Sequence, residues 1–132
     1  MAPINIENIY DGIPEHLPEE WFQILLENRN FRIERIVSKG QGTPEGQWFD
    51  QDADEWVILL KGAAGLRFKD DEPVVKLLPG DHLHIPAHVK HRVEWTADHE
   101  NTVWIAIHYA SAAAAEEEHN LNRSHAESRR TR

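Results

Sequence analysis

Between residues 30 and 109 the sequence consists of short apolar runs separated by turns rich in glycine, proline and acidic residues. The turns include KGQGTPEG (39–46), KDDEP (69–73) and TADHE (96–100), whose residue types favour tight turns. The runs, each a candidate strand, are FRIERIVS, QWFD, EWVILLKG, AGLRF, VVKLL, HLHIP, HRVEWT and NTVWIAIHY. Strands at this regular spacing, with no helices between them, predict an all-β sandwich or small barrel.

The two ends of the chain do not follow this pattern. Residues 1–16 read as irregular or as a short edge strand. LPEEWFQILLEN (17–28) begins with proline and acidic residues and places apolar side chains on one helical face, which predicts a short helix packed on the barrel. We therefore expect an N-terminal arm over 1–29, a barrel over 30–109 and a tail over 110–132. The tail has one large apolar residue, Leu121, so we expect it to be helical or disordered.

The composition excludes several classes of protein. There are 23 Asp and Glu against 14 Lys and Arg in 132 residues, a net charge of −9, which disfavours nucleic acid and anionic membranes as partners. The chain has no cysteine, so disulfides, thiolate metal sites and cysteine nucleophiles are excluded. The sequence shows neither a signal peptide nor an apolar run of the roughly 18 residues that a membrane helix needs. We expect a cytoplasmic, single-domain protein that binds a small molecule.

One stretch, GDHLHIPAHVKH (80–91), contains four histidines in twelve residues. His82 and His84 alternate with apolar residues, so they share one face of a predicted strand. The sequence does not say whether this face points into the barrel or outward. We expect His82 and His88 to be mostly scaffold.

This stretch, with the proline before it, resembles the second conserved motif of cupins. Gly80 and Pro86 occupy fixed positions of that motif, and His91 falls on its metal-binding histidine. His88 stands where the motif usually has glycine, and Trp95 where it ends in asparagine.

The chain also resembles the first cupin motif in the spacing of its fixed positions, but it lacks the two histidines of that motif. Glu55 and Gly62 match its last two fixed positions, and Gly42 matches its opening glycine. The two histidine positions fall on Trp48 and Asp50.

The resemblance covers roughly residues 30–109. Within the cupin family, the chain resembles a subgroup of small bacterial single-domain proteins. It implies a double-stranded β-helix, the jelly-roll barrel of this family, with six to eight strands and a central pocket. It also implies a homodimer.

By the same resemblance, the ligands of a metal ion become Asp50, Glu55 and His91. Two carboxylates and one imidazole suit a divalent ion such as Fe, Mn, Zn or Ni, with open positions for water or substrate. The alternative is a lost metal site, in which Glu55 and His91 are simply hydrogen-bonded in the pocket.

Four further residues are candidates for the pocket. His84 and His108 lie at alternating positions of otherwise apolar strands and are candidate acid–base groups. Trp48 and Trp104 are candidate walls for a substrate.

The leading hypothesis is a metal-dependent enzyme that acts on a small molecule. Oxygenase, lyase, isomerase and decarboxylase chemistry are all possible on such a fold, and the fold does not choose among them. Two alternatives stay open: a binding or sensor module without turnover, and a structural barrel that only self-associates.

Overall fold

The computed structural model describes residues 3–69 and 71–111, and within these residues the chain forms eight strands and no helix. The predicted tail therefore lies almost wholly outside the described residues. None of the described segments is a helix long and apolar enough to cross a membrane. The strands are β1 (Trp21–Glu27), β2 (Phe31–Ser38), β3 (Ala53–Lys61), β4 (Ala64–Arg67), β5 (Val75–Leu77), β6 (His82–Ile85), β7 (Arg92–Thr96) and β8 (Thr102–Ala110).

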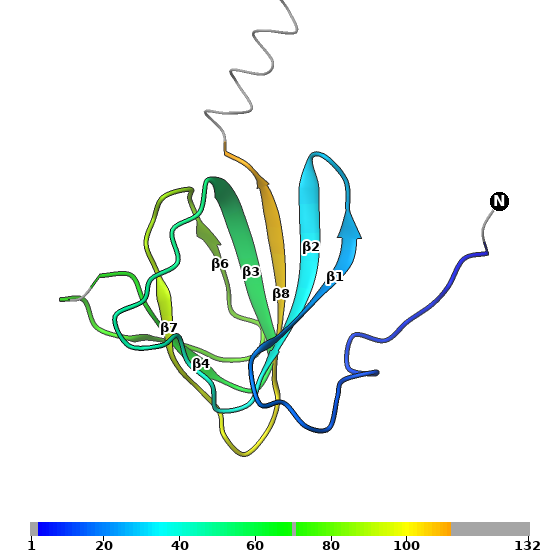
Figure 1. Cartoon of the computed structure of the whole chain (residues 1–132), viewed down its shortest axis with the longest axis horizontal. Helices are drawn as coiled ribbons and strands as arrows, with labels where there is room; N and C mark the ends of the chain where they lie inside the picture. Colours follow the sequence, from blue (N-terminus) through cyan, green and yellow to red (C-terminus); the bar gives the residue numbers. More distant parts are fainter. Residues whose placement is uncertain (1–2, 70, 112–132) are drawn as a thin grey trace, which may run out of the picture.

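The strands form two sheets that face each other across the barrel (Figure 1). The larger sheet has the order β1-β2-β8-β3-β6, and the smaller has the order β5-β4-β7. Every pairing is antiparallel. The all-β prediction is confirmed, and β1 is one edge of the larger sheet.

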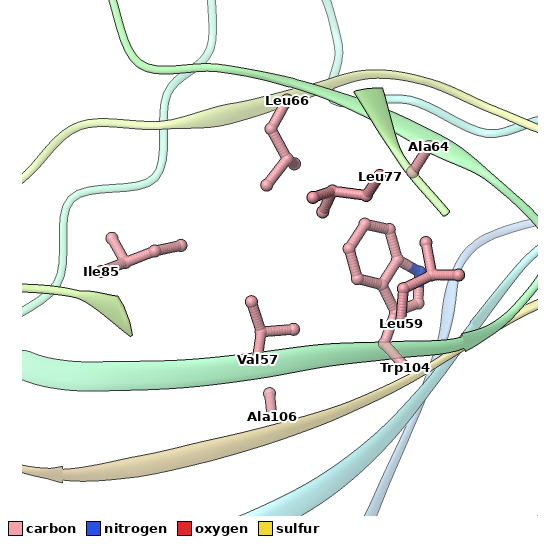
Figure 2. Close-up of a cluster of buried hydrophobic side chains, with 8 residues drawn as sticks. All are labelled: Val57, Leu59, Ala64, Leu66, Leu77, Ile85, Trp104 and Ala106. Carbon is pink, nitrogen blue, oxygen red and sulfur yellow. The ribbon is translucent and has the colours of Figure 1, made fainter. Parts of the chain in front are cut away.

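The core lies between the two sheets, where their inward-facing side chains meet (Figure 2). Alternate residues of β3 and β8 point toward side chains of β4 and β5, as the two-residue period of a strand requires. The buried members of this core are Val57, Leu59, Ala64, Leu66, Leu77, Ile85, Trp104 and Ala106.

The N-terminal helix predicted over residues 17–28 is wrong, because Trp21–Glu27 is strand β1. This segment pairs with β2 from Trp21↔Val37 to Glu27↔Arg32. The register shifts between Ile24 and Leu26, so a bulge breaks the strict alternation of a strand. The broken alternation gave the apolar residues a helix-like spacing, while pairing with β2 decides the outcome.

One predicted strand, QWFD, is reduced to an isolated bridge between Phe49 and His91.

On β6 the open question about the two histidines is answered by the register. His82 and His84 point outward and are exposed, while Ile85 is buried in the core. His82 lies against the outward-facing ring of Trp56, with ring centroids 5.4 Å apart.

Candidate functional site

A cavity of about 350 Å³ lies between the two sheets, within the size range of small-molecule sites. Strands of both sheets contribute to its wall. The apolar lining consists of Phe22, Ile36, Phe49, Val57, Leu66, Ile85, Val93 and Trp104, and the polar lining of Glu20, Arg32, Glu34, Gln51, Glu55, His91 and His108.

The imidazole of His108 stands between two carboxylates on the cavity wall. Its Nδ1 is 3.6 Å from Oε2 of Glu55, and its Nε2 is 3.8 Å from Oε2 of Glu34. The side chains of all three residues are only 11–12% exposed. Both separations are slightly longer than a hydrogen bond, so the imidazole lies against the two carboxylates as an electrostatic contact and not as a hydrogen-bonded pair.

The strand order explains this arrangement. β8 lies between β2 and β3, and His108 is directly paired with Glu55 on β3. On the other side His108 pairs with Arg32 of β2, so Glu34 lies one diagonal position away on the same face. Arg32 Nε is 2.6 Å from Oε1 of Glu34, so that guanidinium is already paired.

His91 forms a second polar point on the cavity wall and is 6% exposed. Its Nδ1 is 3.0 Å from the carbonyl oxygen of Val89. A carbonyl oxygen only accepts, so Nδ1 donates, and in the neutral ring Nε2 is left with its lone pair. The ring of Phe49 stacks on His91 at 5.6 Å and fixes its orientation further.

Glu20, just before β1, brings a third carboxyl group to the cavity. Burial raises the pKa of Glu20 above its usual value of 4.5, and the hydroxyl of Ser38, which donates to its Oε2 at 2.8 Å, opposes this shift. Burial is the larger effect because it penalises the charged form.

This shift predicts that Glu20→Gln stabilises the protein at neutral pH. The folded state holds the Glu20 proton more tightly than the unfolded state, so this residue favours folding below about pH 4.5 and loses that contribution as pH rises through the raised pKa. Glutamine is neutral at every pH and its amide oxygen still accepts from Ser38. Melting curves should show a higher Tm for the variant at pH 7 and a smaller difference near pH 4. A larger gain near pH 4 than at pH 7 would contradict the raised pKa.

The family model for the cupin domain matches residues 35–108 of this chain. The chain belongs to the cupin family. No curated protein matches the chain.

Among solved structures, one from Ralstonia eutropha JMP134, named as a "putative mannose-6-phosphate isomerase", is 44% identical with a TM-score of 0.78. The match covers 82% of this chain and all of the other. A cupin superfamily protein from Desulfitobacterium hafniense DCB-2 is 19% identical, with a TM-score of 0.61 over 75% of this chain and 84% of its own. A cupin-2 domain containing protein from Shewanella frigidimarina NCIMB 400 is 20% identical, with a TM-score of 0.56 over 74% and 84%. The last two support the fold alone.

The structure places four of the predicted cupin site residues in the cavity. Glu55, His91, His108 and Trp104 all line it. Glu55 and Trp104 are also among the buried residues of the barrel. The amide of Gln51 donates to Oε2 of Glu55 at 2.7 Å and holds this carboxylate in place.

The other three predicted residues do not line the cavity. Asp50 is exposed, and its Oδ1 is 3.1 Å from Nδ1 of His88, a residue that adopts φ 65°. His84 projects from the outer face of β6, where its Nε2 is 3.2 Å from Oδ2 of Asp54.

Trp48, at the first histidine position of the first cupin motif, does not line the cavity. Its ring contacts Arg92 instead. The guanidinium carbon of Arg92 lies 5.7 Å from its ring centroid, within the range of a cation–π contact. Arg92 also donates to the carbonyl oxygens of residues 43 and 47 and so fixes the segment that carries Trp48.

The expected metal ligands are therefore not assembled. Glu55 and His91 line the cavity, while Asp50 is engaged with His88 outside it. Across residues 3–69 and 71–111, no three His, Asp or Glu side chains converge closely enough to hold a metal ion. The side chains therefore do not form the three-residue ligand set that the cupin resemblance implies.

Sequence reasoning missed Glu34, Arg32 and Glu20. Glu34 and Arg32 are charged residues two apart in the predicted strand FRIERIVS, and the sequence analysis singled out neither. A charged pair at the same-face positions of a strand with apolar neighbours was the available signal. Glu20 lies in the segment predicted as a helix, so its place beside the cavity was not foreseeable.

Proposed function

We propose that the protein binds a small hydroxycarbonyl compound in the barrel cavity and moves a proton on it, with His108 as the acid–base group. The observation that carries this proposal is the position of His108 between Glu34 and Glu55 on the cavity wall. Imidazole is the side chain best suited to accept and return a proton near neutral pH. The two carboxylates orient the ring and stabilise it when it carries the proton.

The relative from Ralstonia supports this class of chemistry through its name. Isomerisation of an aldose to a ketose moves a proton from the carbon next to the carbonyl to the carbonyl carbon, and the proton of the hydroxyl on that first carbon passes to the carbonyl oxygen. In the proposed step His108 takes the carbon-bound proton and returns a proton to the former carbonyl carbon, while the hydroxyl proton moves from one oxygen to the other. The apolar side chains of Val57, Ile85 and Trp104 form the wall of the cavity beside this group.

The charge of the cavity favours an uncharged substrate over a phosphorylated one. Glu20, Glu34 and Glu55 line it, against a single arginine, Arg32, which is paired with Glu34. A dianionic phosphate placed among these carboxylates would meet unfavourable interactions in a site of low dielectric. We therefore expect the free sugar, or a similar neutral hydroxycarbonyl compound, to bind better than its phosphate ester.

The test is hydrogen exchange on the substrate. The parent protein is incubated in D₂O with mannose and, separately, with mannose 6-phosphate, and the hydrogen next to the carbonyl is followed by NMR. We expect exchange with the neutral sugar and a loss of about 100-fold or more in His108→Gln, the scale of general acid–base catalysis. His84→Gln is the matched control, because His84 faces outward and should leave the rate unchanged.

Two results would contradict the proposal. Exchange that persists in His108→Gln would show that another group moves the proton. A ligand-induced rise in Tm without exchange for any hydroxycarbonyl compound tried would instead favour a binding or sensor module without turnover.

Divalent-metal binding is a second candidate, favoured by His91, whose Nδ1 lies 3.0 Å from the carbonyl oxygen of Val89 and which lines the same cavity as Glu55. Neutral imidazole with its Nδ1 hydrogen-bonded to a carbonyl is the state in which histidine binds metals. The test is elemental analysis of untagged protein beside Glu55→Gln and His91→Gln. Near one equivalent in the parent, lost in both folded variants, would support it. No metal after reconstitution with Fe, Mn, Zn or Ni would exclude it.

A further inference from the structure

Polar side chains gather at one end of the cavity. His108 on β8 pairs with Arg32 of β2 on one side and with Glu55 of β3 on the other, so these residues form one row across the sheet. Glu34 lies in the next row and still reaches His108, with 3.8 Å between its Oε2 and Nε2 of the imidazole. Gln51 donates to Glu55 at 2.7 Å and adds an amide to the same cluster. This end of the cavity can therefore hydrogen-bond a polar group of a ligand.

The following rows of the same sheet line the cavity with apolar side chains. Val57 stands two residues after the glutamate of β3, and Trp104 stands four residues before the histidine of β8. Trp104 pairs with Ile36 of β2, which in turn pairs with Phe22 of β1. All four side chains line the cavity. Because four residues of a strand span about 13 Å, the wall changes from charged to apolar over the length of a small molecule.

The facing sheet also contributes apolar side chains. Leu66 of β4 and Val93 of β7 pair with each other, and both line the cavity. Figure 2 shows Val57 and Leu66 pointing toward each other from the two sheets. Both sheets therefore enclose one apolar section of the cavity. This section consists of Phe22, Ile36, Val57, Leu66, Val93 and Trp104.

Glu20 lies at the far end of the apolar section. Its Oε2 accepts a hydrogen bond from Ser38, which is two residues past Ile36 on β2. Burial raises the pKa of Glu20, which favours the neutral carboxyl group. The charged end and the apolar section therefore remain distinct along the cavity.

Part of the apolar section is not covered by the protein itself. Phe22 is 53% exposed although it lines the cavity, and Ile36 and Val93 are only half-buried. Removing apolar surface from water is favourable, so an apolar ligand group that covers these side chains would add to the affinity.

From this division we infer that the ligand has two parts, a hydroxycarbonyl group at His108 and an apolar group, such as an aromatic ring, in the apolar section. The first part rests on the proposed function. The second adds the class of substrate, a hydroxycarbonyl compound with an aryl or alkyl substituent. A free hexose carries hydroxyl groups along its whole length. In the apolar section these would lose their hydrogen bonds to water without gaining others, so a hexose fits the cavity less well.

The test compares two compounds that share the hydroxycarbonyl group, hydroxyacetone and α-hydroxyacetophenone. The second has a phenyl ring where the first has a methyl group. Calorimetry on the full chain measures both dissociation constants. We expect the phenyl compound to bind about 10-fold more tightly or better, because most of its ring becomes buried. Equal affinities, or no binding of either compound at millimolar concentration, would overturn the inference.

A pair of substitutions locates the ring. Ile36→Thr/Val93→Thr places two hydroxyls in the apolar section and should reduce the preference for the phenyl compound by about 5-fold or more. Val75→Thr is the matched control, because Val75 is 45% exposed on β5 and does not line the cavity. Circular dichroism verifies that both variants are folded. A preference that survives in the double variant would place the ring elsewhere and overturn the inference.

Hydrogen exchange separates this inference from the proposed function. Exchange of the hydrogens next to the carbonyl of hydroxyacetone, in D₂O, tests proton transfer in the parent and in His108→Gln. A phenyl preference without exchange would support the apolar section and contradict proton transfer by His108. Exchange without a phenyl preference would support proton transfer and contradict the two-part ligand.

Discussion

Replacing Trp104 with alanine should destabilise the protein by about 3–5 kcal/mol, the usual cost of removing a large aromatic side chain from a core. Trp104 is 4% exposed and packs within the cluster between the sheets (Figure 2). It also lines the cavity, so its removal enlarges the site as well as weakening the core. Against a total stability of about 5–15 kcal/mol this is a large fraction. Urea denaturation monitored by circular dichroism measures the loss.

Two further variants show whether burial is the cause. Trp95→Ala removes the same ring from β7, where it is 38% exposed, and should cost clearly less. Trp104→Phe keeps an aromatic ring and removes Nε1, which is buried without a hydrogen-bond partner among the described residues. Its cost should therefore be well below that of alanine. Equal losses for Trp104→Ala and Trp95→Ala would contradict the assigned core.

The sequence predicted the barrel because its strands carry local signals. Gly, Pro and acidic turns divide the chain, and β3 and β8 carry the continuous apolar runs 57–60 and 103–107. β1 was mispredicted because its bulge near Leu25 disturbs the two-residue alternation of a strand. β1 is a strand because it pairs with β2 in the folded sheet. The sequence pattern of residues 17–28 alone does not show that a partner strand is present.

The same difference separates the site residues that were predictable from those that were not. Glu55 and His108 face the cavity because their places on central strands fix where they point. Asp50 belongs to a segment outside the strands, where its carboxylate contacts His88 instead of the cavity. Spacing along a sequence predicts which side chains of a strand share a face, but it does not say which face points inward, as His84 shows, and it does not fix the direction of a side chain on a loop.

The second large effect is expected at Gly62, in the turn between β3 and β4. Gly62 adopts φ +89°, a left-handed conformation that other residues enter at a cost of about 1–3 kcal/mol. A Cβ there would also collide with Oγ1 of Thr102 and lie 2.7 Å from its Cα and 2.9 Å from the carbonyl oxygen of Asn101. Two of these atoms belong to the backbone entering β8, so they cannot move aside without displacing the central strand.

Gly62→Ala should therefore destabilise the protein by about 2–5 kcal/mol, combining backbone strain with overpacking. Gly46→Ala is the matched control, since Gly46 has φ +79° but nothing lies within 4 Å of its Cβ position. The control bears the strain without the collision and should lose no more than about 1–2 kcal/mol. If urea denaturation gave the same loss of unfolding free energy for both variants, the collision with β8 would not contribute to the effect of Gly62→Ala. A larger loss at Gly62 means that this close approach, and with it the position of the strand that carries His108, depends on glycine at the end of the first cupin motif.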